Sequence, residues 1–257
     1  MWGELRHNQT APAEYSQQAL TPNNAAMARK QPLELLPESV TPHQTVDGVE
    51  ELTLHTSAGH VAARLHPAPA GAPAVVWVGG AGGGLDGPAG GLYPRLARQG
   101  VASLRLHYRH PNHLEECVLD TLLGAEYLAR QRGYRGVALV GHSFGGAVVI
   151  SAGALSAAVT AVVAMSSQTY GTDLAPQVSP RPLLLVHGTA DEILPDACSQ
   201  NIYDRARDPK ELRLYRGCRH GLDECREQVD ADVVSWLLRA LQPPATPGTG
   251  AAILPQA

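Results

Sequence analysis

Short, wholly apolar runs alternate with segments of helical periodicity along most of this chain. The runs AVVWV at residues 74–78 and PLLLV at residues 182–186 are typical of strands buried on both faces of a parallel sheet. Between such runs, apolar residues recur at helical spacing, most clearly over residues 113–130. This alternation predicts right-handed βαβ units, and therefore an α/β fold with a mostly parallel central sheet and helices on both faces.

The individual elements follow from the same patterns. We expect strands at residues 49–56, 61–66, 74–78, 101–106, 136–140, 159–165, 182–186 and 211–215, and helices at 92–98, 113–130, 144–155, 196–205 and 228–241. The first two strands meet at Ser57-Ala58-Gly59, which predicts a hairpin and an antiparallel edge. Ligands bind beyond the carboxyl ends of the strands in such sheets, so functional residues are expected there.

The two ends of the chain differ in composition from its middle. Residues 1–45 are polar and carry several prolines, whereas residues 242–257 are rich in proline, glycine and alanine. We therefore assign residues 1–45 to an N-terminal extension, 46–241 to the main α/β domain and 242–257 to a flexible C-terminal tail.

Charge and composition exclude several classes of protein. The net charge is -4 without a basic stripe, which argues against nucleic-acid binding. No apolar run is long enough to span a membrane, and the first residues do not form a secretory signal, so we expect a cytoplasmic protein. The chain has four cysteines, which are Cys117, Cys198, Cys218 and Cys225. None of them forms a CxxC pair, and we expect all four to be reduced thiols.

The sequence GHSFG at residues 141–145 fits the pattern G-x-S-x-G around Ser143. An apolar strand leads into it and a helix of small residues follows it. A tight strand-to-helix turn holds such a serine in a strained conformation with its hydroxyl in the cleft. The alternative is an ordinary turn with a serine cap. The context favours Ser143 as a nucleophile.

A serine nucleophile needs a base and an orienting carboxylate, in the order Ser, Asp, His for this architecture. Asp191 follows the strand at 182–186, in the sequence HGTAD. Glu192 is its main competitor and Asp173 a weaker one, and Asp191 could instead cap the next helix.

Two histidines lie late in the chain just past a strand. His220 occurs in the sequence RHG after the last strand, where it can reach the serine, although it could also be a surface residue. His187 directly abuts its own strand, which favours a structural hydrogen-bonding role.

The segments GHSFGG, HGTADEILP and CRHGLDE occur in this order after predicted strands. Over roughly residues 46–241 the chain resembles the α/β-hydrolase superfamily, and in particular its compact esterase and dienelactone-hydrolase-like branches. The resemblance implies the α/β-hydrolase fold and a serine hydrolase that needs no cofactor, with Ser143 as nucleophile, Asp191 as acid and His220 as base. Dienelactone hydrolases proper have a cysteine where this chain has Ser143, so their lactone substrate is not carried over.

Acyl transfer also needs N–H donors for the developing oxyanion. One donor should be the backbone N–H of Phe144, directly after the nucleophile. The loop after the strand at 74–78 reads GGAGGG and resembles the family's HG-x loop, which implies that Ala81 supplies the second N–H. Gly80 and Gly82 are alternatives in the same loop.

Two other chemistries fit short patterns in the chain. Residues 82–87 match G-x-G-x-x-G, but a dinucleotide site needs an acidic residue about 20 positions later, where the chain has His107-Tyr108-Arg109. The spacing of His107, His110 and His113 could indicate a metal, but Pro111 interrupts any helix, and a loop with Asn112 as helix cap explains them equally. We expect no metal. A non-catalytic binding protein of the same fold is the third alternative.

The stretch from Ser166 to Arg181 is too short for a lid of several helices. We therefore expect an open cleft, with Tyr170, Tyr108 and Arg109 as candidate contacts of a small-molecule ester substrate. The sequence favours no particular oligomeric state.

Overall fold

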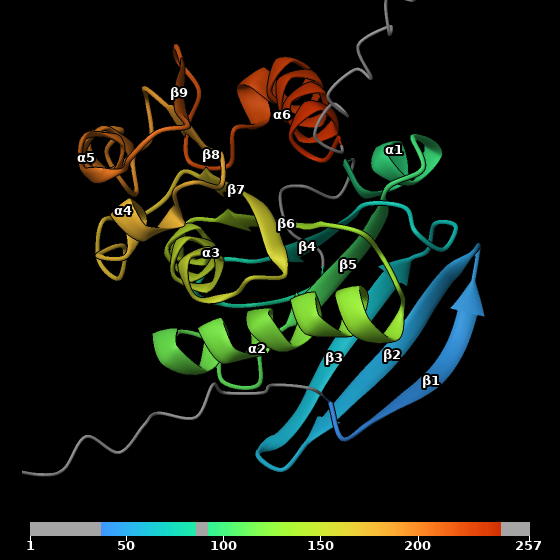
Figure 1. Cartoon of the computed structure of the whole chain (residues 1–257). Helices are drawn as coiled ribbons and strands as arrows, with labels where there is room; N and C mark the ends of the chain where they lie inside the picture. Colours follow the sequence, from blue (N-terminus) through green and yellow to red (C-terminus); the bar gives the residue numbers. More distant parts are fainter. Residues whose placement is uncertain (1–36, 86–91, 243–257) are drawn as a thin grey trace, which may run out of the picture. The chain divides into compact units, whose positions relative to one another are not determined.

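A mixed sheet forms the centre of the described structure. The computed structural model describes residues 37–85 and 92–242. Within these residues nine strands form one sheet with the order β1-β2-β3-β5-β4-β6-β7-β8-β9 (Figure 1). Strands β1, β2, β3 and β5 pair antiparallel, and the strands from β5 through β4 to β9 pair parallel. The mostly parallel sheet expected from the sequence is confirmed.

Every predicted strand and helix has a counterpart in the structure. The strands are β1 Ser39–Val46, β2 Val49–Thr56, β3 Gly59–His66, β4 Ala74–Val78, β5 Ala102–His107, β6 Val137–His142, β7 Val159–Met165, β8 Leu183–Gly188 and β9 Lys210–Tyr215. The α-helices are α1 Leu92–Arg98, α2 Leu114–Glu126, α3 Phe144–Leu155, α4 Ala175–Val178, α5 Ala197–Arg205 and α6 Arg226–Ala240. A π-helical turn, η1 Tyr127–Gln131, continues α2, and a 3-10 turn, η2 Asp223–Cys225, precedes α6.

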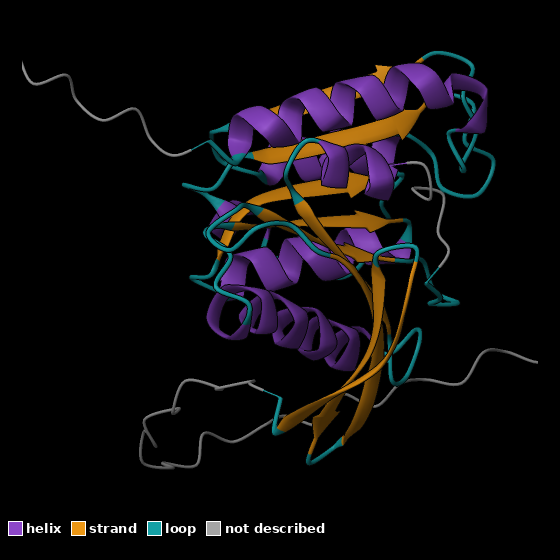
Figure 2. Cartoon of the chain, turned by 90° about the vertical axis from the view of Figure 1, so that its right-hand side faces the viewer, coloured by secondary structure: helices purple, strands orange, loops and turns teal. Residues whose placement is uncertain are grey.

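Helices cover both faces of the sheet. One face packs against α1 and α6, whose buried residues include Leu96 and Trp236. The other face packs against α2, α3, α4 and α5, and α3 is apolar and buried over most of its length because it lies directly on β6 and β7. Figure 2 shows the helices on either side of the strands. All five residues of β4 are buried, as the apolar run AVVWV predicts.

Strand β1 extends the sheet beyond the predicted domain boundary. Residues 39–45 belong to the predicted N-terminal extension, yet they pair with β2 from Ser39 opposite His55 to Val46 opposite Val49. The sequence SVTPHQTV is polar and its side chains are almost all exposed, so no apolar alternation signals this edge strand. The rest of the predicted extension and most of the C-terminal tail lie outside the described residues.

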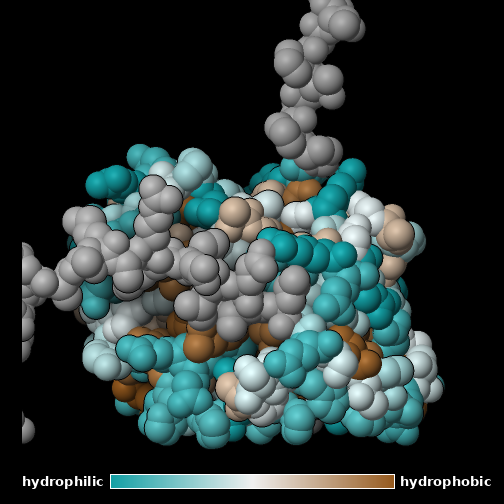
Figure 3. All heavy atoms as spheres, turned by 60° about the horizontal axis from the view of Figure 1, so that its bottom comes forward, coloured by the Kyte–Doolittle hydropathy of each residue, from teal (hydrophilic) through white to brown (hydrophobic). Residues whose placement is uncertain are grey.

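The connection from β7 to β8 is short, as predicted. Its single helix is α4, so the described structure contains no lid domain at this position. Within the described residues no helix is long and apolar enough to cross a membrane. Figure 3 shows a face on which hydrophilic residues predominate and apolar areas are small.

Candidate active site

Ser143 occupies a sharp turn between β6 and α3. Its φ of 58° and ψ of -122° lie in a region that residues with a side chain rarely adopt. The turn is held by two backbone hydrogen bonds, from Ser143 N–H to Met165 O at 2.8 Å and from Gly146 N–H to Ser143 O at 2.9 Å. The strained nucleophile turn that G-x-S-x-G predicts is therefore present in the backbone.

The glycines on either side of this turn are required by close backbone approach. A Cβ on Gly141 would collide with the carbonyl of Gly145, and a Cβ on Gly145 would collide with the carbonyl of Gly79. Gly145 therefore allows the loop after β4 to lie directly against the start of α3. This contact brings the glycine-rich loop next to Ser143.

Asp191 and His220 form a hydrogen-bonded pair. Nδ1 of His220 donates to Oδ2 of Asp191 at 2.8 Å, and the N–H groups of Ile193 and Leu194 donate to Oδ1 at 2.9 and 2.8 Å. Burial would raise the pKa of Asp191, but the Leu194 N–H and the His220 ring outweigh it and lower that pKa below its ordinary value. The carboxylate therefore stays ionised near neutral pH and can orient the imidazole.

The competitors of Asp191 lie elsewhere. The Glu192 carboxylate accepts only the backbone N–H of His220, at 3.4 Å, and Asp173 is exposed in the loop after β7. Within the described residues no hydrogen bond joins Ser143 Oγ to the His220 ring. Such catalytic contacts often tighten only when substrate binds.

His142 connects the nucleophile turn to the loop that carries His220. Its Nε2 donates to the backbone carbonyl of His220 at 2.8 Å, and the two ring centroids are 4.8 Å apart. Burial lowers the pKa of His142 to about 4, against the opposing effect of this hydrogen bond. No pattern in the sequence singles out His142, because only the folded chain brings these two loops together.

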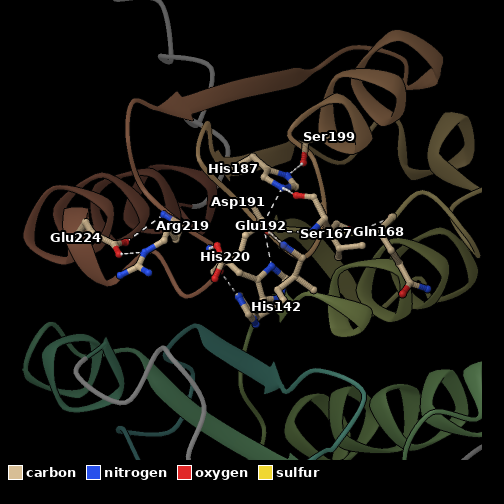
Figure 4. Close-up of polar contacts among 12 residues, drawn as sticks. His142, Ser167, Gln168, His187, Asp191, Glu192, Ser199, Arg219, His220 and Glu224 are labelled. Carbon is tan, nitrogen blue, oxygen red and sulfur yellow. Dashed lines mark hydrogen bonds and ion pairs between the residues drawn. The ribbon is translucent and has the colours of Figure 1, made fainter.

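A second histidine contacts Asp191. His187 lies at the end of β8, and its ring is in hydrogen-bond distance of Asp191 and Ser199 (Figure 4). The sequence predicted a structural hydrogen-bonding role for His187, but its partners could not be read from the pattern.

The glycine-rich loop after β4 contacts Ser143. A Cβ built on Gly80 would lie 3.5 Å from Cβ and 3.9 Å from Oγ of Ser143, and Gly83 N–H donates to Gly80 O at 2.9 Å. The Phe144 N–H is the first of α3, where no intrahelical carbonyl is available to it. The predicted donors Phe144 and Ala81 thus belong to segments that meet at Ser143. Donation to an oxyanion stays a prediction.

Residues at the end of β5 support this loop. Tyr108, only 1% exposed, donates its hydroxyl to Gly79 O at 3.2 Å, and Gly84 N–H donates to Nδ1 of His107 at 2.8 Å. The Arg109 side chain pairs with the buried Asp120 through Nε at 2.5 Å. The side chains of Tyr108 and Arg109, both predicted substrate contacts, are therefore hydrogen-bonded to other parts of the protein. A direct role in substrate binding stays a prediction for them and for Tyr170, which is 77% exposed.

The cysteines differ from the expectation of reduced thiols. A disulfide joins Cys218 to Cys225, whereas Cys117 and Cys198 are free. The bridge encloses His220, because the loop after β9 turns back at η2 and brings the two cysteines together. Spacing alone does not reveal this turn.

The three histidines considered as metal ligands, His107, His110 and His113, do not share one site. His107 supports Gly84, whereas His110 contacts Glu116 and lies 6.2 Å from His113 between ring centroids. In the described part of the chain, no three acidic, histidine or cysteine side chains are grouped as metal ligands. Part of the G-x-G-x-x-G match, residues 86 and 87, lies outside the described residues.

Comparison with known sequences gives a short match. No family model matches the chain. The uncharacterized protein YfhR of Escherichia coli O157:H7 is 40% identical over 81 residues, which are 28% of this chain and 27% of that protein. YfhR of E. coli K12 matches over the same share. The matched segment thus covers little more than a quarter of these relatives.

Solved structures match over most of the described chain. Est1E from Butyrivibrio proteoclasticus is 18% identical with a TM-score of 0.66, covering 74% of this chain and 98% of that one. A dienelactone hydrolase from Anabaena variabilis is 16% identical with a TM-score of 0.68, covering 78% and 99%. A lidless α/β serine hydrolase from Xanthomonas campestris is 20% identical with a TM-score of 0.64, covering 80% and 100%. At these identities the likeness concerns the fold.

Proposed function

We propose that this chain, which has the α/β-hydrolase fold, is a serine hydrolase that cleaves a carboxylic ester or thioester. The observation that carries the proposal is the hydrogen-bonded pair of Asp191 and His220 at the sheet edge where Ser143 follows β6 in a strained turn. A nucleophile, a base and an orienting acid in this chain order are the parts that acyl transfer requires.

The mechanism uses these residues in two steps. Ser143 Oγ attacks the substrate carbonyl while His220 takes the hydroxyl proton, and the N–H groups of Phe144 and Ala81 stabilise the resulting oxyanion. Collapse expels the alcohol or thiol, which receives the proton from His220, and leaves an acyl group on Ser143. Water then attacks this ester with His220 again as base, and free acid and Ser143 are regenerated. The charge on Asp191 supports the imidazolium in both steps.

The names of the neighbours are consistent with this proposal. The Xanthomonas campestris protein is described as a serine hydrolase without a lid, and the Anabaena variabilis protein as a dienelactone hydrolase. The proposed chemistry involves a small-molecule substrate and no cofactor. The cytoplasmic location stays a prediction from the sequence.

The test is covalent labelling of Ser143. Wild-type protein should react with a fluorophosphonate probe and hydrolyse p-nitrophenyl acetate, and Ser143→Ala should do neither while it keeps its fold by circular dichroism. Ser167→Ala is the matched control, since its hydroxyl donates to the carbonyl of Gln168 in the neighbouring loop. Retained labelling in Ser143→Ala would refute the proposal.

A further inference from the structure

His187 is a fully buried histidine with three hydrogen-bond partners. Its Nε2 lies 3.1 Å from Oδ2 of Asp191 and 3.0 Å from the carbonyl oxygen of Leu194, and its Nδ1 lies 2.7 Å from Oγ of Ser199. Figure 4 shows the ring of His187 between Ser199 and Asp191. Neither the ring nor the Asp191 carboxylate is exposed to solvent.

These partners determine where the proton of His187 lies. A carbonyl oxygen and an ionised carboxylate only accept hydrogen bonds, so Nε2 must carry the proton that both share. Nδ1 of a neutral imidazole is an acceptor, and the hydroxyl of Ser199 donates to it. Of the two neutral tautomers, these partners therefore favour the Nε2–H form.

One oxygen of Asp191 thus receives two imidazole N–H groups. Oδ2 is 2.8 Å from Nδ1 of His220 and 3.1 Å from Nε2 of His187. We propose that His187 is a positioning residue, which aims Oδ2 of Asp191 at His220 and sets the basicity of His220. This inference rests on the proposed function, since it assigns a role relative to the triad.

Two effects follow from a second donor on the same oxygen. The carboxylate cannot rotate without breaking the hydrogen bond from His187, so the His220 ring keeps its orientation. The His187 N–H also withdraws part of the negative charge that would otherwise stabilise the His220 imidazolium. Without this donor, the carboxylate should hold the proton on His220 more strongly.

Other titratable and charged groups lie near His220, and the substitution of His187 removes none of them. Within the described residues they include His142 from the end of β6, Glu192 beside the backbone N–H of His220, and the ion pair of Arg219 with Glu224 on its own loop. Asp191 is the group through which His187 acts. A change in the titration of His220 after substitution of His187 can therefore be attributed to the carboxylate.

The first experiment compares His187→Leu with wild type, using p-nitrophenyl acetate. We expect kcat to fall on the order of 10- to 100-fold because the acid is misplaced, with KM little changed. We also expect the acidic limb of the pH profile of kcat/KM to move up, on the order of half a pH unit. A purely structural role would lower the melting temperature without moving this limb.

Two variants separate positioning from packing. In His187→Gln the amide nitrogen can occupy the place of Nε2 and donate to Asp191. This variant should therefore keep most of the wild-type kcat, and the acidic limb of its pH profile should stay at the wild-type pH. His66→Leu replaces another strand-end histidine, whose Nδ1 has no partner in the described structure, and should leave kcat unchanged. The proposal would be overturned if the acidic limb of the pH profile of His187→Leu stayed at the wild-type pH. It would also be overturned if His187→Gln were as slow as His187→Leu.

A measurement on the wild-type protein covers the case in which His187→Leu does not fold. Nitrogen-15 NMR of labelled histidines at pH 8 should show the Nε2–H tautomer for His187. An Nδ1–H tautomer there would overturn the inference. Because this signal needs no turnover, it can hold even if Ser143→Ala disproves the hydrolase, so the two failures are distinguishable.

Discussion

Oδ2 of Asp191 lies 2.8 Å from Nδ1 of His220, although the two residues are 29 positions apart in the sequence. Asp191 follows β8 and His220 follows β9, and these two strands are parallel neighbours in the sheet. Loops that follow adjacent parallel strands emerge at the same edge, so the topology itself brings Asp191 and His220 together.

This pairing predicts different results for two neighbouring carboxylates. Asp191→Asn should lower kcat about 10³- to 10⁴-fold, because the amide neither selects the His220 tautomer nor supports the imidazolium. Glu192→Gln should change kcat little, since its carboxylate accepts a long hydrogen bond, 3.4 Å, from the backbone N–H of His220 rather than one from the imidazole ring. Steady-state kinetics on both variants checks this. A Glu192→Gln variant slower than Asp191→Asn would assign the acid to Glu192.

His142 should make the fold sensitive to acid. Its pKa in the folded protein is about 4, below the ordinary value of 6.5. Between these two pH values His142 therefore binds a proton in the unfolded chain but not in the folded chain. Stability is therefore lost as the pH falls from about 6.5 towards about 4. At pH 5 the loss should be about 2 kcal/mol relative to pH 7.5.

The matched variant for this prediction is His142→Gln. Its amide can still donate to the His220 carbonyl but does not titrate. Urea denaturation at pH 7.5 and pH 5 should show that the wild-type free energy of unfolding falls by about 2 kcal/mol more than that of the variant. The window lies above the range in which Asp191 would be protonated. If the free energy of unfolding fell equally in the wild type and the variant, His142 would not be the group responsible.

The disulfide gives a direct chemical prediction. Of the four cysteines, two should react with a thiol reagent in denaturant before reduction, and four afterwards. Cys225→Ser should lower the free energy of unfolding by about 2–3 kcal/mol, because the unfolded chain is no longer constrained. It should also reduce kcat, since the bridge encloses the His220 loop. Cys198→Ser is the control. Four reactive thiols before reduction would restore the expectation from the sequence.

Local patterns are sufficient to predict the strands, the helices and the sharp turn at Ser143. The run AVVWV is apolar because β4 is buried on both faces, and the glycines at 141 and 145 are dictated by backbone contacts next to Ser143. Each of these features is a property of a short segment, so the residue types record it directly.

Contacts between segments were not visible in the same way. Tyr108 lies just past a strand end, where a cleft residue is expected, but its hydroxyl reaches inward to Gly79 O. His142 and His187 became site residues only through partners on other loops. Strand β1 is stabilised by pairing with β2 rather than by burial, so its polar sequence resembles a linker.

The open connection between β7 and β8 predicts a preference for short acyl groups. This connection holds only the helix α4, and Tyr170 within it is 77% exposed. The cavity beside the glycine-rich loop, lined in part by Gly79 and His142, has a volume of about 20 Å³, enough for a water molecule. A cavity of this size has no room for a long acyl chain, in which each buried CH₂ would contribute about 0.8 kcal/mol.

The measurement is kcat/KM for p-nitrophenyl esters from acetate to palmitate. We expect the highest values for the shortest acyl groups and no activation at a lipid interface, because no described element has to move to uncover the site. Bulky acids that remain partly in solvent should also be accepted. A steep rise in kcat/KM towards long chains would contradict the open-cleft interpretation. It would instead favour a lipase whose lid comes from the N-terminal residues, of which 1–36 lie outside the described structure.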